Sequence, residues 1–138
     1  MSVEINWLAV LLATVAGMIC AGLWYTKSLF GPTWRKLTGV SEADSQKAGN
    51  KPMVMVLITN IITAVVLTVV INMSKTVFEN NSVGFVLFIG FVLWLAFSAT
   101  TLATHNAFEQ KSTKLTWINN GYQLVLFLSM SLVIGLFK

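Results

Sequence analysis

The sequence predicts an all-α integral membrane protein with four transmembrane helices, and three observations point to this fold class. Of its 138 residues, 56% are hydrophobic and only 10% are charged, whereas a soluble domain usually carries about 25% charged residues. Four apolar stretches reach the roughly 20 residues that a helix needs to cross a hydrocarbon core. Helices are also the only open-chain structures that satisfy every backbone hydrogen bond without water.

The four predicted spans form a single domain over residues 1–138, arranged as two helical hairpins. The first span has no basic segment before it and is longer than the apolar core of a signal peptide, so we expect it to be retained. The spans cover about residues 5–25, 52–73, 83–104 and 115–137, and the loops 26–51 and 105–114 lie on one side of the membrane.

Basic residues predict how the spans are oriented. The loops 26–51 and 105–114 hold five and two Lys or Arg residues, whereas the other side has only Lys75 and Lys138. Because cytoplasmic loops are enriched in Lys and Arg, we expect these loops in the cytoplasm and both termini outside the inner membrane of a bacterium. The net charge of +4 does not predict nucleic-acid binding, since the basic residues are dispersed and form no dense patch.

The first loop predicts two short helices at the membrane interface. Pro32 suits the first turn of one helix, which Gly39 ends. Ser41, with Asp44 three positions later, predicts the N-terminal cap of a second helix. The loop serves either as a solvated connector or as a lid or docking element for a partner. The aromatic residues that we expect to anchor the chain at the interfaces are Trp24, Tyr25, Trp34 and Trp117.

Small residues recur every four positions along the first span, at Ala9, Ala13, Gly17 and Ala21. Such a stripe lies on one helical face and lets another backbone approach closely, which strengthens the dispersion contacts between helices in lipid. The partner of this stripe is either another helix of the same chain or a second copy in a homo-oligomer.

Polar residues gather in the cytoplasmic half of the predicted bundle. On the third span, Ser98, Thr101 and His105 are spaced by three and four positions and therefore share a helical face. Counting about 1.5 Å per residue, Asn60, Thr101 and Gln123 reach about 10–15 Å into the bilayer. Because polar groups inside a membrane need partners and often mark sites, we predict a ligand pocket here. Its candidate residues are Asn60, Thr101, His105, Asn119, Tyr122 and Gln123.

Two adjacent asparagines, Asn119 and Asn120, stand near the start of the fourth span. They are unfavourable in a membrane helix unless their side chains find partners. Thr101 and His105 on the third span are the partners that we expect, and such bonds either fix helix packing or form part of a ligand site.

No catalytic or metal-binding arrangement is apparent in the sequence. His105 and Glu109 are one helical turn apart, but two ligands do not complete a zinc site, and no serine lies in a nucleophile context. His105 is either the residue that ends a membrane helix or, because histidine exchanges protons near neutral pH, part of a proton relay. Cys20 is the only cysteine and acts as a small hydrophobic residue. We therefore expect no enzymatic activity, no metal and no cofactor.

Several short motifs resemble those of a known family. They are Trp24-Tyr25, Leu29-Phe30-Gly31 with Trp34, Thr100-Thr101, Asn106, Phe108-Glu109 and Trp117-Ile118-Asn119-Asn120-Gly121-Tyr122. On these residues, and over nearly the whole chain, the sequence resembles the bacterial membrane family catalogued as domain of unknown function 1761. The Leu-Phe-Gly and Ile-Asn-x-Gly-Tyr pieces are the most specific. The resemblance implies a small four-helix inner-membrane protein and transfers no catalytic residue.

The sequence leaves two functions of different classes open. In the first, the protein is an oligomeric binding or transport-type module in the lipid bilayer, and it holds a small polar or amphipathic ligand in the predicted pocket. Four helices are too few to enclose a wide pore, so conduction would need several copies in a homo-oligomer. In the second, the protein is a structural or accessory subunit that docks other membrane proteins, and its polar residues only fix helix packing.

Overall fold

Four long helical segments make up most of the molecule. A computed structural model describes residues 4–137, and this part of the chain contains helices and no strand. The segments that are long and apolar enough to cross a membrane are α1 (Trp7–Trp24), α4 (Lys51–Val77), the third span (Val83–Phe108) and α7 (Thr113–Leu136). The predicted fold class is confirmed, and the protein is a multi-pass membrane protein.

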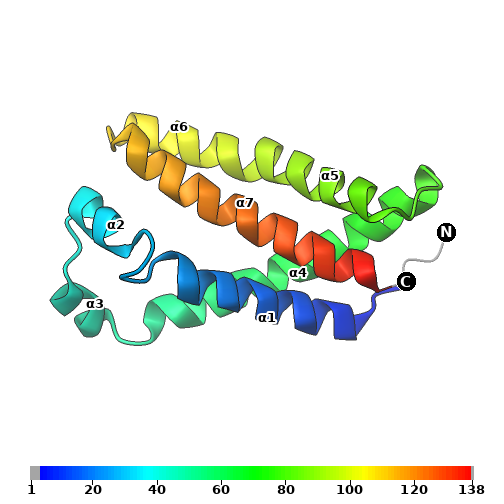
Figure 1. Cartoon of the computed structure of the whole chain (residues 1–138), viewed down its shortest axis with the longest axis horizontal. Helices are drawn as coiled ribbons and strands as arrows, with labels where there is room; N and C mark the ends of the chain where they lie inside the picture. The colour runs from blue at the N-terminus through cyan, green and yellow to red at the C-terminus, as the bar shows by residue number, and fades with distance from the viewer. Residues whose placement is uncertain (1–3, 138) are drawn as a thin grey trace.

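Helix α7 lies at the centre of the bundle. It packs against α1, α5 and α4, and in Figure 1 it runs between α1 and the third span. Helices α2 (Gly31–Thr38) and α3 (Glu42–Ala48) lie at the same end as the turn between α6 and α7, opposite the ends of the chain. We call the end with α2, α3 and this turn the basic end, because seven of the nine Lys and Arg residues lie there.

The two short helices of the first loop form as predicted. Helix α2 has proline in its first turn and ends at Gly39, whose φ of 77° is the left-handed conformation that glycine adopts without steric cost. Helix α3 begins with a capping box, in which Ser41 Oγ accepts from the Asp44 backbone N–H at 3.0 Å and Asp44 Oδ2 accepts from the Ser41 N–H at 3.0 Å. Local sequence therefore determines where α2 ends and where α3 begins.

The small-residue stripe of α1 is buried within the chain. Ala9, Ala13 and Gly17 are buried against α4 and α7, and Ala21 is half-buried. A Cβ atom at Gly17 would lie only 2.6 Å from Cε of Met130 and 2.9 Å from Cδ1 of Leu126, so any side chain here would force the packed side chains of α7 to shift. We call this interface of α1, α4 and α7 around Gly17 the seam. The close approach that the stripe predicted takes place between helices of one chain.

The turn between the third and fourth spans is shorter than predicted. Helix α6 continues to Phe108 and α7 begins at Thr113, so helical structure extends into both ends of the stretch 105–114 that the sequence assigns to a cytoplasmic loop. Hydropathy marks where a helix leaves lipid, but polar residues such as His105 remain helical beyond that point. The chain turns only near Gln110, whose φ is 55°.

The third span is interrupted by a π-helix. Helix α5 (Val83–Leu93) is followed by η1 (Trp94–Ala99), a π-helical turn, and then by α6 (Thr100–Phe108). A π-helix bonds each residue to the fifth along the chain, and it often occurs at functional sites. Nothing in the sequence predicted this interruption, since the segment Trp94–Ala99 contains neither proline nor glycine.

Candidate functional site

A groove of about 390 Å³ opens between α4 and the third span. Its walls come from α4 on one side and from η1 and α6 on the other, and buried and half-buried residues of α7 form its floor. The lining is mixed, with apolar side chains among uncharged polar ones. The polar residues are Thr59, Asn60, Thr63, Ser98, Thr101, Tyr122 and Gln123.

Four of the six predicted ligand residues line this groove. They are Asn60, Thr101, Tyr122 and Gln123. The structure therefore brings together residues of the second, third and fourth spans, as their common depth predicted. His105 and Asn119 do not line the groove, and Thr59, Thr63 and Ser98 do so without having been among the candidates.

Three of the polar lining residues, Thr59, Asn60 and Thr101, have polar contacts inside the protein, and Thr59 Oγ1 donates to the Val56 carbonyl oxygen of its own helix at 3.0 Å. Asn60 is 2% exposed, and its Nδ2 lies 3.3 Å from the Sδ atom of Met18, which is a weak acceptor. Thr101 Oγ1 donates to the Phe97 carbonyl oxygen of its own helix at 2.8 Å, so its oxygen can still accept a hydrogen bond. Asn60 and Thr101 keep hydrogen-bonding capacity toward the groove.

Three other polar side chains in the groove have no hydrogen-bond partner among the described residues, namely those of Thr63, Ser98 and Gln123. At about 1.5 Å per residue, each lies about 15–18 Å along its helix from the basic end, well inside a hydrocarbon core of about 30 Å. Unpaired polar groups at that depth are costly because lipid supplies no hydrogen bonds. The groove thus contains donors and acceptors that the chain itself does not use.

His105 lies apart from the groove. Its side chain is exposed on α6, one turn nearer the basic end than Thr101. Glu109 does not pair with it, because the Glu109 Oε2 atom forms a salt bridge with Lys111 Nζ at 3.1 Å. Among the described residues, no group of three His, Cys, Asp or Glu side chains is arranged to hold a metal ion.

The prediction that Asn119 pairs with Thr101 or His105 was wrong. The Oδ1 atom of Asn119 accepts from the Tyr25 hydroxyl at 2.8 Å, and neither Thr101 nor His105 bonds to it. The reason is that Asn119 faces the end of α1, which packs closely against α7. A different pair links α6 to α7, since Asn106 Nδ2 donates to Thr116 Oγ1 at 3.0 Å.

Aromatic residues at the end of α1 join it to the start of α7. The indole Nε1 of Trp24 donates to the Ile118 carbonyl oxygen at 3.1 Å. The ring of Tyr25 meets the ring of Tyr122 edge-on, with their centroids 5.3 Å apart. Since Tyr122 also lines the groove, these contacts fix one part of the groove floor.

Helix α2 folds back onto the same place. Phe30 packs on Trp24 with ring centroids 4.6 Å apart, and Trp34 meets the edge of Tyr25 at 5.7 Å. Three of the four residues predicted to anchor the chain at an interface thus have contacts inside the protein, whereas Trp117 is 73% exposed. We call this cluster the aromatic junction: Trp24, Tyr25, Phe30, Trp34 and Tyr122.

The π-helix η1 supplies part of the groove wall. Phe97 and Ser98 of η1 line the groove, and Trp94 at its start donates from Nε1 to the Asn120 carbonyl oxygen at 3.0 Å. This bond ties η1 to α7 behind the groove. The side-chain Oδ1 of Asn120 is buried without a partner in the described chain, and it lies outside the groove lining.

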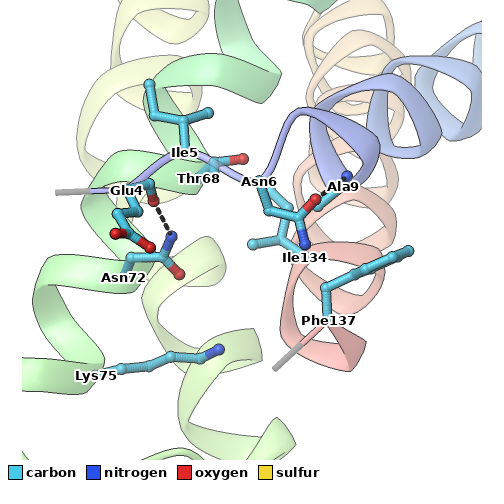
Figure 2. Close-up of a pocket in the computed structure, with 9 residues that line it drawn as sticks. All are labelled: Glu4, Ile5, Asn6, Ala9, Thr68, Asn72, Lys75, Ile134 and Phe137. Atoms are coloured by element: carbon cyan, nitrogen blue, oxygen red, sulfur yellow. Dashed lines mark hydrogen bonds between the residues drawn. The ribbon is translucent and has the colours of Figure 1, made fainter.

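A second polar cavity, of about 410 Å³, lies at the opposite end of the bundle, between the start of α1, α4 and the end of α7. Figure 2 shows the amide of Asn72 turned toward Glu4, whose carbonyl oxygen accepts from Asn72 Nδ2 at 3.4 Å. The Oδ1 atom of Asn6 accepts from the backbone N–H groups of Leu8 and Ala9 and so caps α1. These side chains join and cap helix ends, and we assign the cavity a structural role. The sequence did not predict this cavity, because its polar residues are scattered.

Comparisons with known proteins bear on the whole chain. The model of the family described as protein of unknown function DUF1761 matches residues 8–135. The chain belongs to this family. The DUF1761 match covers the aromatic junction and every residue of the groove, and it confirms the resemblance seen in the sequence. No curated protein and no solved structure matches the chain.

Proposed function

We propose that this DUF1761 protein is a membrane-embedded binding module of a transport type, which holds a small polar or amphipathic ligand in the groove between α4 and the third span. The observation that carries the proposal is the set of unpartnered polar side chains, Thr63, Ser98 and Gln123. A ligand that offers hydrogen bonds to them would remove the cost of leaving polar groups unpaired in lipid. No catalytic step is part of the proposal.

The proposed location is the cytoplasmic membrane of a bacterium, with the basic end in the cytoplasm. The distribution of Lys and Arg supports this orientation. Alkaline phosphatase is active only outside the cytoplasm, so a fusion of this enzyme to the C-terminus should be active. If that fusion were inactive and a separate C-terminal fusion to green fluorescent protein were fluorescent, the orientation would be the reverse of the proposed one. We further propose a homo-oligomer, because four helices with one lateral groove do not enclose a path across the membrane.

Two threonines of α6 provide a matched pair of variants for testing the binding site. Thr101 and Thr104 are both exposed, and each donates to a carbonyl oxygen of its own helix, at 2.8 and 2.9 Å. Only Thr101 lines the groove. Thr101→Val and Thr104→Val therefore remove the same atoms with the same local effect, and differ in what they do to the groove.

The test is the set of small molecules that co-purifies with the protein from its native membrane, extracted and measured by mass spectrometry. We expect one compound class to be enriched with the wild type and with Thr104→Val, and depleted with Thr101→Val and Gln123→Leu. Equal profiles for all four proteins would overturn the proposal. If a larger membrane protein co-purified equally with all four and no small molecule were enriched, the accessory-subunit function would replace it.

A further inference from the structure

The groove continues from its polar part into an apolar part. An apolar cavity of about 360 Å³ lies next to the groove, also between α4 and the third span, and a residue of α7 completes its lining. The two cavities share three lining residues, Thr63, Phe97 and Phe127, so they form one continuous depression. Between Thr59 and Val70 the depression follows α4 for about 16 Å, at about 1.5 Å per residue.

The part farther from the basic end is almost entirely aliphatic and aromatic. It is lined by residues such as Val66, Val70 and Leu93. Val66 is 54% exposed, so this part opens sideways toward lipid and is not enclosed by the chain. An aliphatic chain could enter it directly from the bilayer without crossing water.

The part nearer the basic end offers hydrogen bonds but no charge. Thr63, Ser98 and Gln123 have no partner in the described chain, and Thr101 can still accept a bond. None of the described residues lining either part is Asp, Glu, Lys, Arg or His. A ligand with a charged head would have to leave water without a counter-charge, which is strongly unfavourable in a membrane.

From this arrangement we infer the class of ligand: an amphiphile with an uncharged, hydroxyl- or carbonyl-bearing head and an aliphatic chain. The head lies among Thr63, Ser98, Thr101 and Gln123, and the chain follows Val66 and Leu93 toward the opposite end. The inference rests on the proposed function and specifies its ligand. Selectivity comes from the head, because lipid tails are as apolar as the groove wall and moving a chain between them gains little.

The probe is a 1-monoacylglycerol with a photoreactive diazirine in its acyl chain, in dioleoylphosphatidylcholine vesicles that contain the full-length protein. Unlabelled 1-oleoylglycerol and its 3-phosphate are the competitors, because they share the acyl chain and the glycerol and differ by the charged phosphate group on one hydroxyl. We expect the label on peptides of α4, η1 and α7 that line the groove. The phosphate should need at least about tenfold higher concentrations to compete, given the cost of a buried charge.

The threonine pair separates specific binding from general contact with lipid. Thr101→Val should lower labelling of the groove several-fold, and Thr104→Val should leave it unchanged. If the groove is labelled and the phosphate competes as well as or better than the neutral glycerol, the inferred ligand class is wrong while the proposed binding function stands. If labels spread evenly over the lipid-facing residues of all four spans and neither competitor acts, the groove binds no amphiphile. Co-purification then decides the proposed function independently.

Discussion

The seam and the groove are two interfaces of similar depth that involve the same central helix, yet one is closed and the other open. In the seam, Ala13, Ala64 and Met130 are each 0% exposed. In the groove, Phe97 is 72% exposed, and Thr101 faces outward beside it. Helix α7 contributes to both, so the difference comes from its neighbours.

Side-chain size explains why one interface closes. The seam has Gly17 on α1 and Ala64 on α4, which let three helices meet. The groove has Thr63 on α4 and the bulky Phe97 on η1, and both side chains line it. Small residues thus build the stable part of the bundle, and their absence leaves room for a ligand.

Filling the seam should have the largest effect on stability. Gly17→Leu places a side chain where even a Cβ would meet Met130 and Leu126 at 2.6 and 2.9 Å. We expect the free energy of unfolding to fall by about 1–3 kcal/mol or more, measured by denaturation in detergent micelles. Gly22→Leu is the control, since a Cβ at Gly22 has no neighbour within 4 Å. Equal loss in both variants would show that the seam is not closely packed.

The adjacent asparagines should respond in opposite ways. Asn119→Leu leaves the Tyr25 hydroxyl without its acceptor and should destabilise the protein by about 0.6 kcal/mol, and at most about 1.7, as for other hydrogen bonds between membrane helices. Asn120→Leu removes a buried oxygen that has no partner in the described chain, so stability should stay equal or rise. The same unfolding assay compares them, and the reverse order would contradict the contacts of the aromatic junction.

Shortening a groove side chain should change binding but not stability. Phe97→Ala removes a ring that is 72% exposed, and we expect a change of less than about 0.5 kcal/mol in unfolding. Labelling by the photoreactive monoacylglycerol should fall, because Phe97 belongs to both parts of the groove. Phe88→Ala, at a ring 58% exposed on α5, should change neither quantity. A large loss of stability in Phe97→Ala alone would mean that the groove is part of the core.

The smallest expected effect is a local pH dependence in α3, outside the spans. Hydrogen bonds from the backbone and side chain of Ser41 lower the pKa of Asp44 below its ordinary value of 3.8. A lowered pKa in the folded state means that the charged carboxylate stabilises α3 above pH 3.8, and this contribution disappears as the pH falls through the lowered pKa. The protection factors of the α3 amides, which are corrected for the intrinsic slowing of exchange in acid, should therefore fall below about pH 4. The Asp44→Asn variant should lose most of this pH dependence. If the variant and the wild type showed the same pH dependence of protection in α3, the capping box would be contradicted.

The sequence predicted the parts of the structure that depend on composition and depth. Apolar length gives the four spans, and equal depth brings Asn60 and Gln123 into one groove. It could not predict how each helix is rotated about its axis, which packing determines. Asn119 therefore faces Tyr25 of α1, contrary to expectation. The π-helix likewise could not be predicted from regular helical spacing. The exposed position of His105 agrees with one of its two sequence interpretations, a residue at the end of a membrane helix, and not with its place among the candidate ligand residues.

The most direct test of the central claim is an experimental structure of the protein in a lipid bilayer, for example by cryo-electron microscopy with a bound antibody fragment. We expect α4 and the third span to remain apart around Thr63 and Phe97. Elongated density should fill the space between them, with one end beside Thr101 and Gln123. Direct packing of Phe97 against α4, with no space for a ligand, would contradict the account.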